Sequence, residues 1–101
     1  MGKTQTIKLI KEYLKTIKNY VHIQRAVLFG SYANGTQKEE SDIDVGIFVK
    51  QLRGDYLDLL KQLYQARKAI DYRIEPHVFI IGKDESGFSE EVLQNGEEIM
   101  L

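Results

Sequence analysis

Two aspartates, Asp42 and Asp44, stand two positions apart at the start of the apolar segment 42–49, "DIDVGIFV". Because side chains alternate along a β-strand, both carboxylates would point to the same side of the strand and repel each other. A hard divalent cation removes this repulsion, since magnesium prefers oxygen ligands and is typically held by one or two carboxylates together with substrate phosphates. The spacing therefore indicates a magnesium site; the simpler alternative is two solvated aspartates at a strand start.

A Gly-Ser pair, Gly30 and Ser31, directly follows an earlier apolar segment, "RAVLF" (25–29). Glycine lets the backbone approach a ligand closely, and successive N–H groups at a helix start can bind an anion, to which the serine hydroxyl adds a donor. If the two apolar strands are neighbours, this phosphate-binding turn and the aspartate pair meet at one end of a sheet. That combination suits a metal-bound nucleoside triphosphate.

A third carboxylate is available in segment 70–81, "IDYRIEPHVFII", which alternates and then becomes apolar. In a strand, Asp71, Arg73 and Glu75 would share one face. Only one of the two carboxylates can then lie opposite the aspartate pair, because residues four apart in a strand are roughly 13 Å apart. The other would pair with Arg73 or face solvent. His77 is either a strand-edge histidine or a contact to a base or phosphate.

Helices and strands that position these residues can be predicted from the spacing of apolar side chains. Spacings of three and four predict helices at about 5–20 and 55–69, the second capped by Asp55, and a short helix from Ser89 to Gln94 that stops at Gly96. Strands are expected at 25–29, 42–49 and 70–81, where Pro76 indicates an edge position or a bulge, and "EIML" is a candidate last strand. This order predicts one domain, residues 1–101, of the α/β (α+β) class: a small mixed sheet flanked by helices.

Composition narrows the compartment and the partners. The net charge of −1 argues against direct nucleic-acid binding, and the absence of cysteine excludes a disulfide framework and a thiolate metal site. No apolar run approaches the roughly 18 residues of a membrane span, so we expect a cytoplasmic protein. The core of a 101-residue chain is small, which leaves room for stabilisation by a homo-oligomer or another partner.

The segment 30–45, "GSYANGTQKEESDIDV", resembles the signature of the DNA polymerase β-like nucleotidyltransferase superfamily: Gly-Ser, a loop of about ten residues, then Asp-x-Asp before an apolar strand. The positions that match are Gly30, Ser31, Gly35, Ser41, Asp42 and Asp44. The chain's size resembles that of the minimal nucleotidyltransferases (MNT domains), which include the MntA-like antitoxins. The resemblance covers roughly residues 23 to 81 and implies the polymerase β-like nucleotidyltransferase fold.

Site roles follow from this resemblance. It implies that Gly30, Ser31 and Ser41 bind the nucleotide and that the aspartate pair binds two magnesium ions, with ATP as substrate. It also implies a third carboxylate on a later strand, which is a metal ligand too. Asp71 resembles that residue because an alternating strand and a proline follow it, and we favour it; Glu75 is the alternative, since some members use glutamate.

The function implied is magnesium-dependent transfer of a nucleotide monophosphate, AMP from ATP in the first place, to a hydroxyl. MNT proteins are commonly encoded beside a HEPN-domain toxin, so the resemblance implies an antitoxin that adenylylates this toxin. A module that sequesters a toxin or holds a nucleotide, with weak or no catalysis, is the main alternative. Transfer to an RNA end or to a small molecule such as an aminoglycoside is a third.

Overall fold

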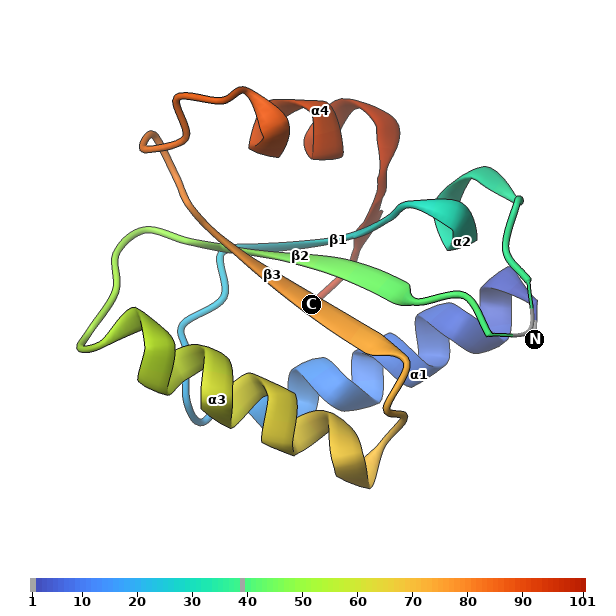
Figure 1. Cartoon of the computed structure of the whole chain (residues 1–101), viewed down its shortest axis with the longest axis horizontal. Helices are drawn as coiled ribbons and strands as arrows, with labels where there is room; N and C mark the ends of the chain where they lie inside the picture. The colour runs from blue at the N-terminus through green and yellow to red at the C-terminus, as the bar shows by residue number, and fades with distance from the viewer. Residues whose placement is uncertain (1, 39) are drawn as a thin grey trace.

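The structure, a computed structural model, describes residues 2–38 and 40–101 (Figure 1). The predicted order of helices and strands is confirmed, with an additional one-turn helix after the first strand. The elements are α1 (Lys3–Ile17), β1 (Arg25–Phe29), α2 (Ser31–Asn34), β2 (Ile43–Val49), α3 (Tyr56–Ala66), the 3-10 turn η1 (Arg67–Ala69), β3 (Ile74–Ile80), α4 (Phe88–Asn95) and β4 (Glu97–Ile99).

A mixed four-stranded sheet, in the order β3-β2-β1-β4, forms the centre of the fold, as predicted. β1 runs antiparallel to both β2 and β4, whereas β2 and β3 are parallel and α3 makes the crossover between them. β3 is therefore an edge strand, which confirms the position indicated by Pro76. Proline is tolerated at an edge because its missing N–H faces no neighbouring strand.

The two faces of the sheet are covered unequally. Figure 1 shows α1 and α3 on one face and α4 on the other. Alternate β2 residues Ile43, Val45 and Ile47 are buried in the larger core cluster, to which α1 and α3 contribute, while Phe48 packs with Val92 of α4 in a smaller one. Because side chains alternate, Asp44 lies on the α4 face, away from the main core.

The beginning of β3 differs from the prediction. The strand was expected over 70–81, but it begins at Ile74, and η1 and a turn occupy the preceding residues. The N–H of Asp71 donates to the carbonyl of Arg67 at 2.8 Å, and the N–H of Ile74 donates to the carbonyl of Asp71 at 3.1 Å. These bonds continue the helical path of the chain for one more turn, so Asp71 is not part of the strand.

Helix ends agree more closely with the sequence. Asp55 caps α3 as predicted, since its carboxylate accepts the N–H of Leu57 at 2.7 Å. α4 begins at Phe88, one residue before the predicted Ser89, because Gly87 takes the left-handed conformation at the N-cap. Within the described ranges, none of the helices combines the length and the apolar character needed to cross a membrane.

Candidate active site

Asp44 lies where three strands meet. It pairs with Phe29, the last residue of β1, on one side, and with Glu75 of β3 on the other. Residues paired directly across neighbouring strands point to the same face, so the side chains of Asp44 and Glu75 leave the sheet as neighbours on the α4 face. The Asp44 side chain keeps 25% of its surface exposed, which leaves its oxygens open to a ligand.

Gly30 brings the backbone of the Gly-Ser turn against Asp44. Its φ is 75° and its ψ is −151°, and a Cβ built there would lie 2.5 Å from Oδ2 of Asp44. Glycine adopts this conformation without strain, and its missing side chain permits the close approach. The structure therefore brings Gly30 and Asp44 together, as the sequence predicted, and Ser31 follows as the first residue of α2.

Replacing Gly30 with alanine should destabilise the protein more than the same change at Gly35. Both glycines have positive φ, 75° at Gly30 and 81° at Gly35, and each replacement strains the backbone by about 1–3 kcal/mol. The strain is greater at Gly30, because its ψ of −151° lies in a region essentially restricted to glycine, whereas Gly35 is in the left-handed helical region. At Gly35 nothing lies within 4 Å of the new Cβ, whereas at Gly30 the methyl group collides with the Asp44 carboxylate. Thermal unfolding should show the larger loss for Gly30→Ala; equal losses would contradict both the greater backbone strain at Gly30 and the collision with Asp44.

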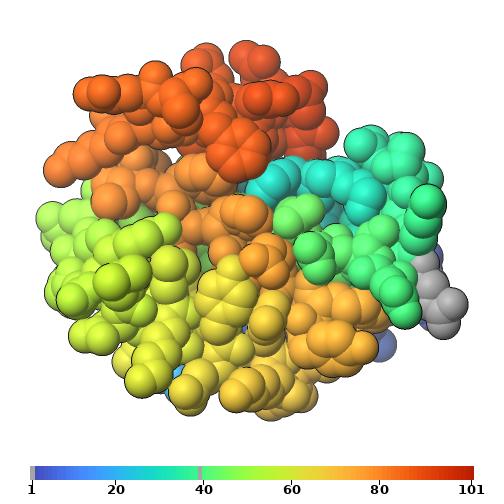
Figure 2. Space-filling model, in the orientation of Figure 1, coloured from blue at the N-terminus to red at the C-terminus, as the bar shows by residue number. Residues whose placement is uncertain are grey.

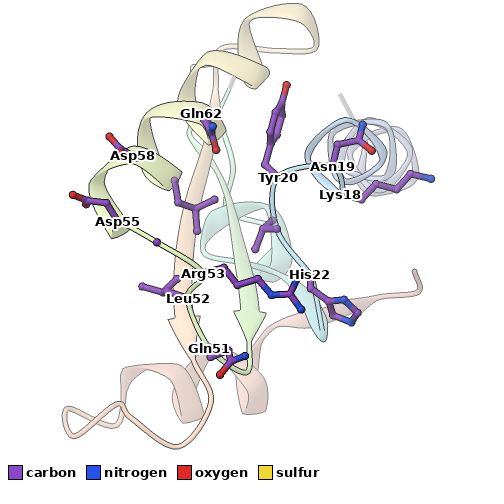
Figure 3. Close-up of a pocket in the computed structure, with 13 residues that line it drawn as sticks. Lys18, Asn19, Tyr20, His22, Gln51, Leu52, Arg53, Asp55, Asp58 and Gln62 are labelled. Atoms are coloured by element: carbon purple, nitrogen blue, oxygen red, sulfur yellow. The ribbon is translucent and has the colours of Figure 1, made fainter.

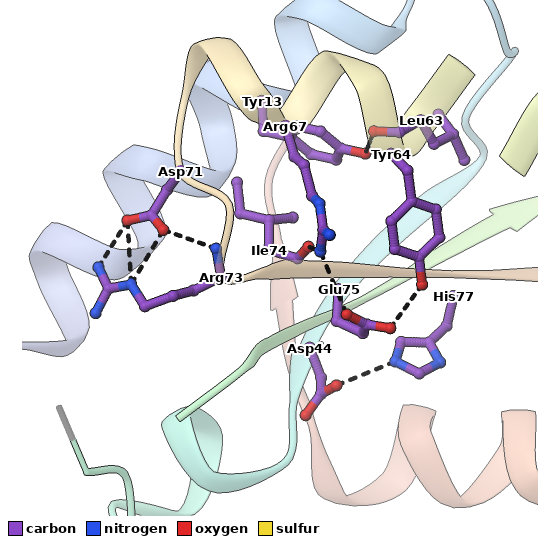
Figure 4. Close-up of polar contacts among 10 residues, drawn as sticks. All are labelled: Tyr13, Asp44, Leu63, Tyr64, Arg67, Asp71, Arg73, Ile74, Glu75 and His77. Carbon is purple, nitrogen blue, oxygen red and sulfur yellow. Dashed lines mark hydrogen bonds and ion pairs between the residues drawn. The ribbon is translucent and has the colours of Figure 1, made fainter. Parts of the chain in front are cut away.

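Glu75 is held on its outer side by two residues that lie three positions apart, one at the end of α3 and one in η1. Figure 4 shows Tyr64 and Arg67 pointing toward its carboxylate. The Tyr64 hydroxyl donates to Oε1 at 2.6 Å, and Arg67 lies 3.4 Å from Oε2. The hydrogen bond to Glu75 is the main cause that raises the pKa of Tyr64 to about 12, so Tyr64 is the proton donor at neutral pH.

Asp71 is engaged elsewhere. Its carboxylate forms a 2.6 Å ion pair with Arg73 and accepts the N–H of the same residue at 2.9 Å. The Arg73 side chain, which also lies 3.3 Å from the hydroxyl of the buried Tyr32, lowers the pKa of Asp71 below its usual value, chiefly by hydrogen bonding. The expected common strand face of Asp71, Arg73 and Glu75 is therefore wrong, because only Glu75 lies in β3. Geometry now favours Glu75 over Asp71 as the third carboxylate.

His77 is a neighbour of Asp44 that sequence reasoning left undecided. Its Nε2 lies 3.0 Å from Oδ1 of Asp44, and its ring packs edge-on against Phe29 with the centroids 4.9 Å apart. The alternation along β3 places His77 on the same face as Glu75. That signal was present in the sequence, but the parallel register that brings His77 to Asp44 was not.

Asp42 and Ser41 lie just before β2. Asp42 is exposed, and within residues 2–38 and 40–101 its carboxylate makes no hydrogen bond or ion pair, so it is open to a ligand. The Ser41 hydroxyl accepts the N–H of Lys38 at 2.8 Å and so closes the loop before the strand. This bond gives Ser41 a structural role in the loop, whatever else it contacts.

The carboxylates of this site fit a cation whose other ligands come from the substrate. Across the part of the chain that the structure describes, no three His, Asp or Glu side chains form a group that could hold a metal ion. Asp44 and Glu75 nevertheless offer carboxylates from paired strand positions, and Asp42 lies two residues before Asp44. This set fits magnesium bound to a triphosphate, since one or two protein carboxylates suffice when phosphates complete the shell.

Two cavities of the described chain lie away from these carboxylates. A cavity of about 450 Å³ borders the opposite end of β2, between the end of α1 and the start of α3 (Figure 3). Another of about 470 Å³ lies beside α1 and the last two residues. Neither includes Asp44 or Glu75. Figure 2 instead shows the surface of β3, in orange, open between α3 and α4, so the candidate site is a surface at the sheet edge.

Comparison with known proteins places the chain in one family and identifies proteins that share its fold. The family model described as "Polymerase beta, Nucleotidyltransferase" matches residues 8–101. "Putative protein adenylyltransferase MJ0604" of Methanocaldococcus jannaschii is 36% identical over 93 residues, which cover 88% of this chain and 92% of that protein. "Putative protein adenylyltransferase MJ0141" of the same organism is 46% identical over 50 residues, 48% of this chain and 50% of that protein.

A solved structure described as "Crystal structure of the toxin-antitoxin with AMP-PNP" has the same fold. It superposes with a TM-score of 0.65 over 93% of this chain and 72% of that chain, at 23% identity. The nucleotidyltransferase fold predicted from the Gly-Ser and Asp-x-Asp pattern is therefore confirmed.

Proposed function

Because the chain belongs to the polymerase beta nucleotidyltransferase family, we propose that it transfers AMP from ATP to a hydroxyl group of a protein. The observation that carries the proposal is the meeting of the Gly30 turn, Asp44 and Glu75 at one end of the sheet. AMP is favoured over other nucleotides because a relative 36% identical over most of both chains is named a protein adenylyltransferase.

Each site residue has a proposed task. Asp42, Asp44 and Glu75 hold magnesium, with Asp71 as the weaker candidate for the third position. The backbone at Gly30 and the hydroxyl of Ser31 contact triphosphate oxygens. When bound, the magnesium neutralises phosphate charge and lowers the pKa of the attacking hydroxyl.

The transfer is a single displacement at the α-phosphorus. The acceptor oxygen forms a bond to that phosphorus, the bond to the oxygen that bridges the α- and β-phosphates breaks, and pyrophosphate leaves with the electron pair. The acceptor proton passes to a carboxylate of the site or to water. Protein groups contribute mainly by orienting the reactants and by matching the charge of the transition state. His77 supports this task, since its contact with Oδ1 leaves Oδ2 of Asp44 beside the Gly30 turn.

The proposed acceptor is a tyrosine of a HEPN-domain toxin, for which this chain is the antitoxin. Two observations support a macromolecular acceptor. The carboxylates lie at an open sheet edge between α3 and α4, where a large partner can approach (Figure 2). A structure with the same fold is described as a toxin-antitoxin with AMP-PNP. An ATP-dependent reaction of this kind would operate in the cytoplasm.

Adenylylation of the toxin can be measured directly as a gain in its mass. We expect that incubation with ATP, magnesium and a HEPN-domain toxin adds one AMP unit to the toxin, measured by intact mass spectrometry. Omitting magnesium, or using the double variant Asp42→Asn/Asp44→Asn, should leave the mass unchanged. If the toxin is neutralised while its mass never changes, the protein is a sequestering module and the proposal is wrong.

A further inference from the structure

We propose that Tyr64 and Arg67 are positioning residues, which reach around the sheet edge from α3 and η1 and hold the Glu75 carboxylate beside Asp44. This inference rests on the proposed function, in which Glu75 is a magnesium ligand. It adds a task for two residues of the helix that covers the opposite face of the sheet.

The edge position of β3 makes this contact possible. Glu75 belongs to the α4 face, whereas α3 packs on the other face, where Leu63 is fully buried in the main core. In the sheet formed by residues 2–38 and 40–101, β3 is an outermost strand. Long side chains from α3 can therefore pass the edge and meet a residue of the far face, which a central strand would not allow.

Tyr64 and Arg67 act together as one clamp. They are three residues apart, so they lie on the same side of the helix, and the Arg67 guanidinium stacks 4.6 Å above the centre of the Tyr64 ring. Arg67 also donates to the carbonyl of Ile74 at 2.9 Å, which fixes it to the backbone one residue before Glu75. Both side chains are partly buried, and their hydrogen bonds leave Glu75 few alternative orientations.

The clamp also leaves the carboxylate able to bind a cation. Each oxygen of Glu75 accepts from one protein donor, and a carboxylate oxygen can accept at two positions. The second position of each oxygen stays available for magnesium. In addition, the positive charge of Arg67 on the outer side offsets the repulsion between Glu75 and Asp44, as His77 contacts Asp44 from its own side.

If the contacts of Tyr64 and Arg67 with Glu75 were only structural, a different result would be expected. A partly exposed ion pair between a helix and a strand contributes about 0–1 kcal/mol to stability. Its loss would lower the melting temperature and leave the magnesium requirement unchanged. A positioning role changes the affinity for magnesium at constant fold, because groups that hydrogen-bond a ligating carboxylate typically affect metal affinity or activity by about 10- to 100-fold.

The decisive variant is Tyr64→Phe, which removes a single hydroxyl. Calorimetric titration of magnesium into the protein with AMP-PNP should give an affinity about tenfold or more below that of the wild type. Tyr72→Phe is the matched control, since Tyr72 is 77% exposed, and it should titrate like the wild type. Arg67→Gln should behave like Tyr64→Phe, with Lys68→Gln on the exposed neighbour as its control.

A double variant shows whether Tyr64 acts through Glu75. Residues that act through a shared partner are non-additive, so adding Tyr64→Phe to Glu75→Gln should cause no further loss of magnesium affinity. The inference would be overturned if Tyr64→Phe bound magnesium with the wild-type affinity, or if the losses of affinity in the double variant were fully additive. Either result would leave the proposed function standing. A wild-type protein that shows no magnesium-dependent AMP-PNP binding would instead overturn the proposed function, and the inference with it.

Discussion

Asp44→Asn is expected to lower kcat/KM for AMP transfer by at least about a hundredfold, the order of loss seen when a group that stabilises transition-state charge is removed. Asp44 is the residue on which the site converges, because it lies against the Gly30 turn and beside both Glu75 and His77. Asparagine has nearly the same shape and can still hydrogen-bond His77. The fold should therefore survive while the negative charge that attracts magnesium is lost.

Steady-state kinetics and calorimetry with AMP-PNP should be measured on the same preparation. Magnesium-dependent binding should disappear in Asp44→Asn, and thermal unfolding should report whether the protein is folded. Asp58→Asn is the matched control, because Asp58 is an exposed aspartate that lines the cavity at the other end of β2. If Asp44→Asn and Asp58→Asn behave alike, Asp44 is not part of the active site.

Prediction from sequence succeeded where the chemistry depends on neighbours along the chain. Alternation in 42–49 correctly placed Ile43 and Val45 in the core and Asp44 on the other face. The prediction that the Gly30 turn and Asp44 meet at one end of the sheet if the two strands are neighbours is also confirmed. Both outcomes follow from local geometry, namely the two-residue period of a strand and the conformational freedom of glycine.

The error at 70–73 has a physical cause. Ile70, Tyr72 and Ile74 alternate with charged residues, which is typical of a strand with one buried face. In the structure Ile74 is fully buried and Ile70 packs partly buried against the same core, but Tyr72 between them is 77% exposed, so the three residues do not form one buried strand face. Backbone hydrogen bonds to Arg67 and the Asp71–Arg73 pair stabilise a turn instead. Alternation alone therefore does not distinguish a strand from a turn that brings only some of its apolar residues to the core.

Contacts around Glu75 could not be read from the sequence at all. They depend on the parallel register of β2 and β3 and on the reach of Tyr64 past an edge strand, and both are set by tertiary packing. The helical spacing of Tyr64 with its neighbours predicted only that it belongs to the amphipathic helix. The proposal of Glu75 as the third carboxylate therefore depends on the strand register as well as on the residue types.

The two candidates for the third carboxylate, Glu75 and Asp71, should differ most in the AMP-transfer rates of their single variants. Glu75→Gln should lower AMP transfer by about a hundredfold, because Glu75 is paired with Asp44 in the sheet and its charge would bind the same cation. Asp71→Asn should change the transfer rate only slightly, since that carboxylate is occupied by Arg73. Its cost should appear in stability, at about 1–2 kcal/mol for a partly buried, charge-assisted hydrogen bond.

The pH dependence of unfolding separates the two roles further. The pKa of Asp71 is lowered in the folded protein from the ordinary 3.8, mainly by its hydrogen bond with Arg73. Its contribution to stability is thus fully present above pH 3.8 and is lost as the pH falls toward the folded-state pKa. Denaturant unfolding should accordingly give a higher free energy of unfolding for the wild type than for Asp71→Asn at neutral pH. The difference between the two should decrease in acid. Abolished transfer in Asp71→Asn, with near-normal transfer in Glu75→Gln, would instead restore Asp71 as the third carboxylate and show that the Arg73 pair opens when substrate binds.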